Sequence, residues 1–525
     1  MVVPELRPWR AARPHVARFA NAVRPRLAAV RPQLARAVNA AKPQVTRLTT
    51  VKTWQYTAGA ATAGLALTAV VVTAAGPWDS TGQRTAERDH AVALEHTGGA
   101  DHGGDSGTTA AGPEPAPSAS SVLTGLGGAT NTVKSAPSGQ ALTAVLTPLL
   151  EDAALGSRRT AAVVDVATGK RLYGAGADDA LTPASTTKIA TAVAALSAMG
   201  PDHRLTTRTA LEPGTHELVL VGGGDPTLTA RKDAEGWASL RELAVRTAKA
   251  LKKDDVRKVT LSYDTTLYAG SGLHPIGVDA NLAQVSPLMA DEARTDDSTS
   301  GTALRAPDPA DDAARKFAAF LEAEGIKTTS PGLSKATDRA QTLAEVSSPP
   351  LSTLVERMLT NSDNDIAEAL ARQTAVATKT RADFDGGGKA IRAQLKKLQL
   401  PVTGVSFKDG SGLNRDDKLT ADLLTALLAK AGDPAHPELR PVLTGLPVAG
   451  FTGTLTTRYT ADGAAGVVRA KTGTLTGVNT LAGTVVDQDG RLLAFAFLAS
   501  NTTSKDAAQS ALDKAATALA ACGCG

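Results

Sequence analysis

Apolar positions recur with two different periods along residues 140–521, and the two periods predict different elements. Spacings of three and four residues are typical of helices that bury one face. They mark residues 141–150, 189–199, 238–251, 310–324, 350–375, 389–398, 420–430 and 505–520. Short runs of β-branched and other apolar residues between turn residues are typical of strands. They mark residues 160–166, 171–173, 217–221, 259–263, 480–486 and 491–500.

The order of these elements predicts an α+β domain over residues 140–521. The first two strands flank Ala-Thr-Gly-Lys and the last two flank Asp-Gln-Asp-Gly, so each pair is expected to form a hairpin. Hairpins near both ends of the segment, with helices between and after them, indicate one antiparallel sheet that is flanked by helices. The mixed pattern of residues 205–347 then indicates a large α/β insertion into this domain.

Residues 57–76 form an uncharged run of small and apolar residues before the predicted domain. A run of about 20 such residues can cross a bilayer as a helix. Trp54 and Tyr56 on one side and Trp78 on the other suit the two membrane interfaces. We therefore expect a single transmembrane signal anchor over residues 53–78. A cleaved signal peptide is the alternative.

The charge of the segments on either side of this run predicts its orientation. Residues 1–52 carry 11 Lys or Arg residues and one acid, Glu5. Such a basic arm favours the cytoplasmic side, so we expect a single-pass protein of the cell membrane with an extracellular catalytic domain. Repeated prolines and few aromatic residues argue against nucleic-acid binding by the arm. Residues 79–139 are rich in Gly, Ser, Thr, Pro and Ala and predict a disordered extracellular linker.

The composition argues against metal chemistry. The two cysteines, Cys522 and Cys524, lie at the extreme C-terminus, so the sequence offers no cysteine-based metal site, and a free or intermolecular thiol is expected there. The eight histidines include no His-Glu-x-x-His pattern, which disfavours a zinc enzyme. No metal and no organic cofactor are expected. With 3% aromatic residues, the core must consist mainly of Ala, Val and Leu.

Ser185 and Lys188 lie at the N-terminal end of a predicted helix whose apolar positions span residues 189–199. Pro183 suits the first turn of a helix, and residues three apart lie side by side on a helix. A serine hydroxyl becomes a nucleophile when a neighbouring base takes its proton, and a lysine with a lowered pKa can be that base. The pair therefore predicts an acylated serine, although Ser-x-x-Lys by itself is more often an ordinary helix start.

Two further motifs offer the rest of such a site. Ser362 and Asn364 lie at a turn-like break in the helix predicted over residues 350–375, where the hydroxyl can relay a proton and the amide can hold a substrate carbonyl. A Lys-Thr-Gly-Thr sequence enters the strand of the last hairpin, where its lysine and hydroxyls can hold a carboxylate and its glycine allows close approach of a ligand. Alone, each motif is typical of an ordinary turn or strand start. The second motif consists of Lys471, Thr472, Gly473 and Thr474.

The ordered set Ser-x-x-Lys, Ser-x-Asn and Lys-Thr-Gly is that of penicillin-binding proteins and β-lactamases. Beyond these motifs, the chain resembles the D-alanyl-D-alanine carboxypeptidase/endopeptidase family of low-molecular-mass class C penicillin-binding proteins, peptidase family S13. The matching stretches are residues 181–185, 220–228, 409–413, 446–455 and 470–475. The resemblance implies a penicillin-binding-protein/β-lactamase-like transpeptidase fold with an insertion between the first two motifs. The long basic arm and linker depart from the short leader usual in the family.

The resemblance implies a serine-type carboxypeptidase that cleaves peptidoglycan D-Ala-D-Ala peptides or cross-links, with β-lactam antibiotics as covalent inhibitors and no cofactor. Lys188, kept neutral by burial and by the charge of Lys471, would take the proton of Ser185. The backbone N–H groups of Ser185 and Thr474 would form the oxyanion hole, and Ser362 would relay a proton to the departing amine. The implied substrate-binding residues are Asn364 for the peptide, and Lys471, Thr472 and Thr474, with Gly473 between them, for the terminal carboxylate.

Two alternatives remain open at this point. A serine β-lactamase shares the three motifs, but it needs an efficient deacylating base and is normally compact, without the insertion or the linker. A non-catalytic, membrane-anchored sensor of β-lactams or peptidoglycan would need a cytoplasmic signalling domain, for which residues 1–52 are too short and too rich in proline. The glycine-rich residues 222–226 and 409–412 are expected to be structural turns.

Overall fold

The computed structural model describes residues 139–277, 279–459 and 463–523. The predicted basic arm, the signal anchor and all but the last residue of the linker lie outside these described residues. Within the described ranges, no helix is long and apolar enough to span a bilayer.

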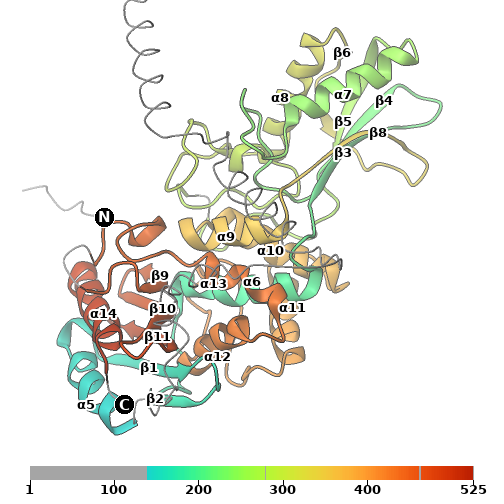
Figure 1. The fold of residues 1–525 in the computed structure, drawn as a ribbon. Coiled ribbons are helices and arrows are strands. Elements are labelled where there is room, and N and C mark those ends of the chain that lie inside the picture. Colours follow the sequence, from blue (N-terminus) through green and yellow to red (C-terminus); the bar gives the residue numbers. More distant parts are fainter. Residues whose placement is uncertain (1–138, 278, 460–462, 524–525) are drawn as a thin grey trace, which may run out of the picture. The chain divides into compact units, whose positions relative to one another are not determined.

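The first and last described strands form one antiparallel sheet (Figure 1). Its order is β2-β1-β11-β10-β9. The N-terminal hairpin pairs with the C-terminal strand, with Val163 opposite Phe495, so both ends of the domain close the same sheet, as predicted. The Lys-Thr-Gly-Thr motif lies inside β9, which pairs with β10 as a strand of its own and was not predicted. The strands are β1 (Arg158–Asp165), β2 (Arg171–Ala175), β9 (Val468–Leu475), β10 (Val478–Val486) and β11 (Leu492–Ser500).

Helices cover both faces of this sheet (Figure 1). Along β11, Phe495 and Phe497 belong to the core beneath the first and last helices, whereas Ala494 and Ala496 belong to the core on the opposite face. Burial on both faces explains why this strand is an unbroken apolar run rather than an alternating one. On one face lie α5 (Gly139–Leu150) and α14 (Lys505–Ala520). The other core is built from α6 (Thr187–Met199), α9 (Leu351–Asn361), α10 (Asn364–Ala377), α11 (Phe384–Lys397) and α12 (Ala421–Gly432).

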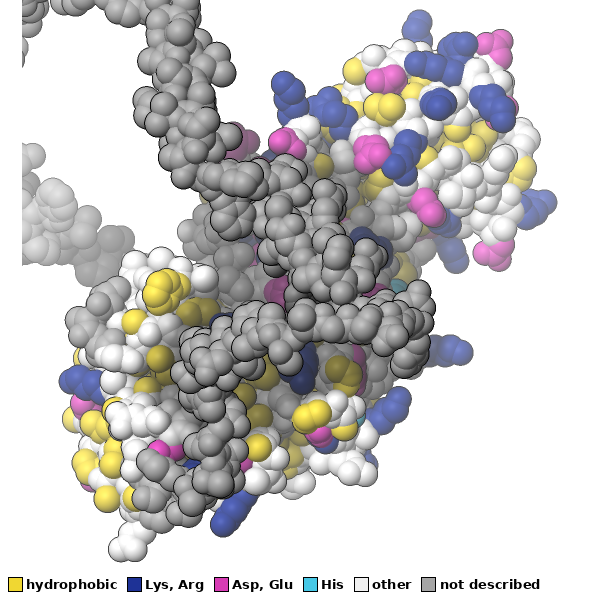
Figure 2. Space-filling view, viewed as in Figure 1, with side chains coloured by type: hydrophobic (Ala, Val, Ile, Leu, Met, Phe, Trp, Pro, Cys, Tyr) yellow, Lys and Arg dark blue, Asp and Glu magenta, His cyan; other side chains and the backbone are white. Residues whose placement is uncertain are grey.

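Residues 206–347 form a second, mixed sheet with its own core. The strand order is β6-β5-β4-β3-β8, and β7 also pairs with β5. The parallel pair β4 and β5 is joined across α7, and Leu243 and Phe317 anchor the helices to the sheet. On the face seen in Figure 2, Lys and Arg side chains alternate with Asp and Glu over this part of the surface. The elements are β3 (Thr206–Leu211), β4 (Glu217–Val221), α7 (Leu240–Lys253), β5 (Lys258–Asp264), α8 (Pro309–Ala323), β6 (Lys327–Thr328), β7 (Gly332–Leu333) and β8 (Gln341–Ser347).

The glycine-rich residues 222–226 form a packed turn after β4. The carbonyl of Gly223 accepts a hydrogen bond from Gln373 of α10, and a Cβ at this glycine would collide with the backbone of Thr206. The glycines therefore allow close backbone packing, in agreement with the structural turn predicted there. The remaining short helices are η1 (Ala153–Leu155), η2 (Ala184–Thr186), η3 (Asp291–Ala293), η4 (Pro437–Leu439), α13 (Pro441–Thr444) and η5 (Gly453–Leu455).

The expectation of a free thiol is wrong for Cys522. This residue is buried beside α14 and is disulfide-bonded, and no free cysteine occurs in the described part of the chain. A disulfide requires Cα atoms about 4.4–6.8 Å apart, whatever the separation in sequence.

Candidate active site

Ser185 lies in the middle of the 3₁₀ turn η2, directly before α6. The regular helix therefore begins at Thr187, later than the predicted start near Pro183. Ala184 has a φ of 48°, in the left-handed region that an alanine rarely adopts, so the backbone is strained next to the serine. Gly412 makes room for this turn, because a Cβ at that glycine would collide with the Ala184 carbonyl.

Lys188 lies in the first turn of α6 and is fully buried. Its Nζ donates hydrogen bonds to Ser185 Oγ (3.1 Å), Asn364 Oδ1 (2.6 Å) and the Ser411 carbonyl (2.8 Å). These three acceptors hold the amine against the serine. Burial lowers the pKa of Lys188 from 10.5 to about 8. The carboxylates that oppose this effect and raise the pKa are those of Asp409, Glu368, Asp363 and Asp365.

Ser362 and Asn364 lie at the junction of two helices, at the break that the sequence predicts. Ser362 ends α9 with a left-handed φ of 58°, and Asp363 caps α10 by accepting the Ile366 N–H. Asn364 is the first residue of α10, and its Nδ2 donates to the Asn281 carbonyl at 3.0 Å. Because its Oδ1 accepts from Lys188, this amide is held at both ends.

Lys471 lies in β9 and is also fully buried. Its Nζ donates to Ser362 Oγ and to the Thr472 carbonyl, each at 2.8 Å. Burial first, and the charge of Lys188 second, lower the pKa of Lys471 well below its usual value. We expected burial and the charge of Lys471 together to lower the pKa of Lys188. Burial does lower it, against opposing carboxylates, whereas the repulsion between the two amines lowers the pKa of Lys471 instead.

Gly473 allows β9 to approach the serine turn. A Cβ at this position would collide with Thr480 Oγ1 and lie 2.7 Å from the Pro183 carbonyl and 3.1 Å from the Ser185 nitrogen. Thr480 Oγ1 donates to the same Pro183 carbonyl at 2.8 Å, which ties β10 to the turn. A glycine is therefore required where the sheet meets the nucleophile.

Thr472 and Thr474 share the face of β9 opposite to Lys471 and Gly473, because strand residues alternate. The hydroxyl of Thr472 donates to Thr454 Oγ1 (3.1 Å), and that of Thr474 accepts from Gln509 Nε2 (3.3 Å). Thr474 is exposed, and β9 is the terminal strand of the sheet order. All eight residues predicted from the sequence therefore lie around η2, the α9–α10 junction and β9.

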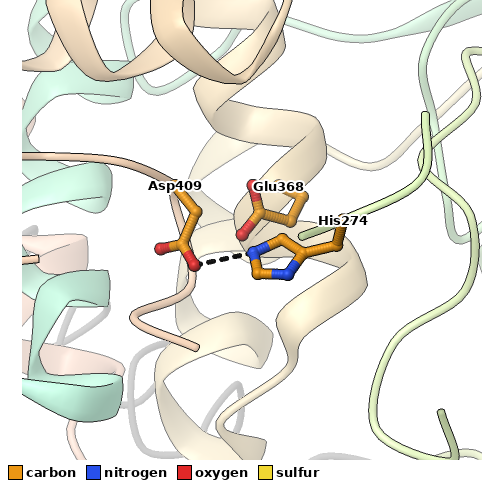
Figure 3. Close-up of side chains that lie close together, drawn as sticks. All are labelled: His274, Glu368 and Asp409. Carbon is orange, nitrogen blue, oxygen red and sulfur yellow. Dashed lines mark hydrogen bonds and ion pairs between the residues drawn. The ribbon is translucent and has the colours of Figure 1, made fainter. Parts of the chain in front are cut away.

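Three buried residues near Lys188 were missed by the sequence analysis: Glu368, Asp409 and His274 (Figure 3). The predicted turn at residues 409–412 is present, but it also supplies the Ser411 carbonyl that accepts from Lys188. Glu368 follows Asn364 by one helical turn, which is the only signal in the sequence that could have pointed to it. His274 comes from a loop far away in the sequence, and no local pattern marks it.

Within the described residues, two clusters each bring three potential metal-ligand atoms close together. The first cluster is His274, Glu368 and Asp409, and the second is Glu292, Asp363 and Asp365. In the first group, backbone N–H groups donate to both carboxylates, and His274 shares a hydrogen bond with Asp409. In the second group, arginine side chains pair with Glu292 and Asp365. Protein donors thus occupy these ligand atoms.

The chain has close relatives among bacterial carboxypeptidases. It is 36% identical over 381 residues to carboxypeptidase DacB of Mycolicibacterium smegmatis, which covers 70% of this chain and 81% of that protein. It is 34% identical over 428 residues to a carboxypeptidase of Mycobacterium tuberculosis, which covers 78% of this chain and 90% of that protein.

The fold is similar to that of penicillin-binding protein 4 from Haemophilus influenzae, with a TM-score of 0.59 and 21% identity over 73% of this chain and 98% of that one. This likeness shows an α+β fold of the penicillin-binding-protein/β-lactamase type. The family model for D-Ala-D-Ala carboxypeptidase 3 (S13) matches residues 142–300 and 293–521. Because that model covers almost all of the described residues, the chain belongs to the D-Ala-D-Ala carboxypeptidase 3 (S13) family.

Proposed function

We propose that this D-Ala-D-Ala carboxypeptidase cleaves peptidoglycan stem peptides or cross-links through an acyl-enzyme on Ser185. The observation that carries the proposal is the buried Lys188 amine, 3.1 Å from Ser185 Oγ. Since burial brings the pKa of Lys188 to about 8, part of the population is neutral near neutral pH and can accept the serine proton. The freed oxygen then attacks the carbonyl of the penultimate D-alanine.

The negative charge that develops on this carbonyl oxygen needs donors beside Ser185. We assign them to the backbone N–H groups of Ser185 and Thr474. The missing side chain at Gly473 supports this assignment, because a Cβ there would lie 3.1 Å from the Ser185 nitrogen and fill the space. Removing a single donor of this kind costs about 100- to 1,000-fold in rate in other enzymes.

Departure of the D-alanine amine requires a proton, and Ser362 is placed to relay it. Lys471 donates to Ser362 Oγ, so the hydroxyl hydrogen is directed elsewhere. Asn364 fixes Lys188 through Oδ1 and offers Nδ2 to a peptide carbonyl, where the Asn281 carbonyl now lies. Lys471, Thr472 and Thr474 bind the terminal carboxylate, whose negative charge favours the protonated form of Lys471. Water then hydrolyses the acyl-enzyme.

Labelled penicillin and a D-Ala-D-Ala peptide test this function on the same protein. We expect the full chain to bind penicillin covalently and to release D-alanine, and Ser185→Ala to lose both activities. Ser197→Ala, on the same helix, is the matched control and should keep both. Equal labelling of Ser185→Ala and the wild type contradicts the assignment of the nucleophile. Penicillin hydrolysis far faster than D-alanine release indicates a β-lactamase instead.

The location of the enzyme and the extent of its insertion are part of the same proposal. Residues 57–76 anchor the chain in the cell membrane, residues 1–52 remain cytoplasmic and residues 79–139 form an extracellular linker. Residues 205–347 are an insertion into the transpeptidase fold, a view supported by the second sheet, whose strands all come from this segment. Membrane fractionation and protease treatment of intact cells test the topology. Release of the catalytic domain from intact cells is expected, and its protection contradicts an extracellular location.

A further inference from the structure

One cluster of three buried side chains near Lys188 has no role in the reaction steps proposed above. Glu368 of α10, Asp409 of the loop between α11 and α12, and His274 of the loop after β5 point toward one another (Figure 3). All three side chains are buried, with residue exposures of 2% or less. Their ligand atoms are engaged by protein donors, so the group needs an explanation other than a metal.

Glu368 acts on Lys188 through the backbone of the 409–412 turn. Its carboxylate accepts the N–H groups of Gly410 (3.1 Å) and Ser411 (2.9 Å). The Ser411 carbonyl, in turn, accepts a hydrogen bond from Lys188 Nζ at 2.8 Å. The carboxylate therefore fixes the turn whose carbonyl holds the amine toward Ser185.

Asp409 and His274 hold the same turn from its other side. Asp409 Oδ1 accepts the Gly412 N–H (2.7 Å), and Oδ2 accepts the Asn414 N–H (2.7 Å). The same Oδ2 forms a hydrogen bond of 2.9 Å with His274 Nε2. Because His274 comes from the segment between β5 and α8, the network links that segment to the base.

We propose that Glu368, together with Asp409 and His274, is a positioning unit for the base: it holds the Ser411 carbonyl on Lys188, and its charge sets the pH range in which Lys188 activates Ser185. This inference rests on the proposed function, since it assigns to Lys188 the role of base. Neither Glu368 nor His274 has a hydrogen bond to Lys188 or Ser185 among the described contacts, so both act through the turn and through charge.

The surroundings of these groups give the sign of each effect. The charged groups that act on Lys188 are Asp365 and Glu368 from α10, Asp363 at the N-cap of that helix, Asp409 from the turn and Lys471 from β9. Burial raises the pKa of Glu368 to about 7, so it is mainly ionised near pH 8, where it favours the protonated lysine.

His274 and Asp417 determine how much negative charge Asp409 presents. Burial lowers the pKa of His274, but the hydrogen bond to Asp409 and the charge of Glu368 outweigh it, so the net shift is upward. Burial and the neighbouring Asp409 raise the pKa of Asp417 well above its usual value, which favours the protonated form of Asp417. His274 Nδ1 accepts the Ile276 N–H at 3.2 Å, so its Nε2 carries the proton and donates it to Asp409 Oδ2. Against the effect of burial, this hydrogen bond lowers the pKa of Asp409 and keeps that carboxylate ionised beside Lys188.

The test is the pH dependence of penicillin acylation in two variants of the full chain. Acylation requires neutral Lys188, so its rate rises with pH through the pKa of that lysine. Glu368→Gln removes a negative charge, and we expect the rising limb to move to lower pH by about one unit. His274→Gln keeps an N–H donor for Asp409 and leaves the charges that face Lys188 unchanged, and we expect the limb to stay in place. Glu322→Gln, on the exposed face of α8, is the matched control and should leave the limb unchanged.

A shift to lower pH in Glu368→Gln with an unmoved limb in His274→Gln supports the proposal, whereas a lower rate with an unmoved limb in both variants shows a merely structural role and overturns it. If Glu368→Gln does not fold, as judged by circular dichroism and urea unfolding, histidine NMR of the wild type decides. The proposal requires the neutral tautomer of His274 with the proton on Nε2, because Nδ1 accepts the Ile276 N–H. A proton on Nδ1 contradicts it. Loss of Ser185-dependent labelling in the wild type is a separate result, which would overturn the proposed function itself.

Discussion

The site contains two lysines that are equally buried and yet have different surroundings. Lys188 lies among the carboxylates of α10 and the 409–412 turn, and burial lowers its pKa only to about 8. Lys471 lies in β9, and within the described residues no carboxylate raises its pKa. Burial, together with the charge of Lys188, lowers that pKa well below the usual value. Two lysines with the same burial therefore differ in pKa because their neighbours differ, which suits them to different roles.

The difference indicates which lysine has all of its polar and charged partners within the protein and which one lacks a partner that the substrate can provide. Lys188 has three acceptors and nearby negative charge, so its position and its acidity are set by the protein alone. Lys471 has two neutral acceptors, Ser362 Oγ and the Thr472 carbonyl. A substrate carboxylate would provide the negative charge that this second lysine lacks. The comparison therefore predicts different effects for matching substitutions at the two positions.

Replacing Lys188 is expected to cause the largest loss. Lys188→Ala removes the base beside Ser185, and general-base catalysis is worth about 100- to 10,000-fold. We expect the second-order rate of penicillin acylation to fall by about 1,000-fold or more, with no recovery at high pH. Stopped-flow or gel-based labelling with a fluorescent penicillin measures this rate. A rate within tenfold of the wild type would show that another group deprotonates Ser185.

The approach of β9 to Ser185 depends on Gly473. In Gly473→Ala, the new methyl group meets Thr480 Oγ1 and the Pro183 carbonyl. We expect about a 100-fold loss of acylation rate, because small displacements at a reacting centre are costly, and about 1–3 kcal/mol of destabilisation. Gly332→Ala in β7, where a Cβ meets open space, is the matched strand control. Equal effects of the two substitutions would contradict this account of the approach.

Much of the fold could be predicted from the sequence because its core elements carry strong periodic patterns. The run at residues 491–500 became β11, and the helix predicted over residues 505–520 matches α14 (Lys505–Ala520). Strands such as β3 (Thr206–Leu211) and the two-residue β6 were missed, because they are short or rich in threonine and arginine and depend on their sheet partners. The 3₁₀ turn at Ser185 was missed because tertiary contacts through Gly412 and Gly473 determine it.

The candidate site, like the fold, contains residues that could be predicted from the sequence and residues that could not. Ser185, Ser362 and Lys471 lie in short motifs, and the motif order was sufficient to group them. Glu368 and His274 carry no motif, because their relation to Lys188 arises only when α10, the 409–412 turn and the loop after β5 fold together. The pKa shifts follow from burial and from charges that are distant in the sequence. For this reason, we expected the repulsion between the two amines to lower the pKa of Lys188, whereas it lowers that of Lys471.

Replacing Lys471 is expected to cause a smaller loss that depends on the substrate. Lys471→Ala removes the amine that we assign to the terminal carboxylate, and a hydrogen bond to a charged group is worth about 1.5–3 kcal/mol. We expect a fall of about 10- to 100-fold in kcat/KM for D-Ala-D-Ala peptides. An analogue that ends in an amide should lose much less. Peptide kinetics with both substrates provides the measurement, and equal losses for the two would contradict the assignment.

The smallest expected effect concerns stability and has opposite consequences for the two lysines. Lys471→Met replaces a buried amine that has no carboxylate partner, whereas Lys188→Met removes a positive charge that the nearby carboxylates of Glu368 and Asp409 stabilise. Replacing a poorly compensated buried charge by an apolar group is often stabilising, so at pH 7 we expect Lys471→Met to be about 1–2 kcal/mol more stable than Lys188→Met.

The sign of the pH dependence follows from the same shifts. The unfolded chain keeps the proton of each lysine up to about pH 10.5, and the folded chain releases that of Lys188 near pH 8. Each lysine therefore costs stability at neutral pH, and the cost fades as the pH rises from the folded to the unfolded pKa. The gain in stability of Lys471→Met over the wild type should therefore decrease as the pH rises toward 10.5. This decrease should begin at a lower pH than any corresponding change in the stability of Lys188→Met relative to the wild type. Urea unfolding between pH 7 and 10 measures both trends. An advantage that does not change with pH would show that packing, rather than a buried charge, distinguishes the two lysines.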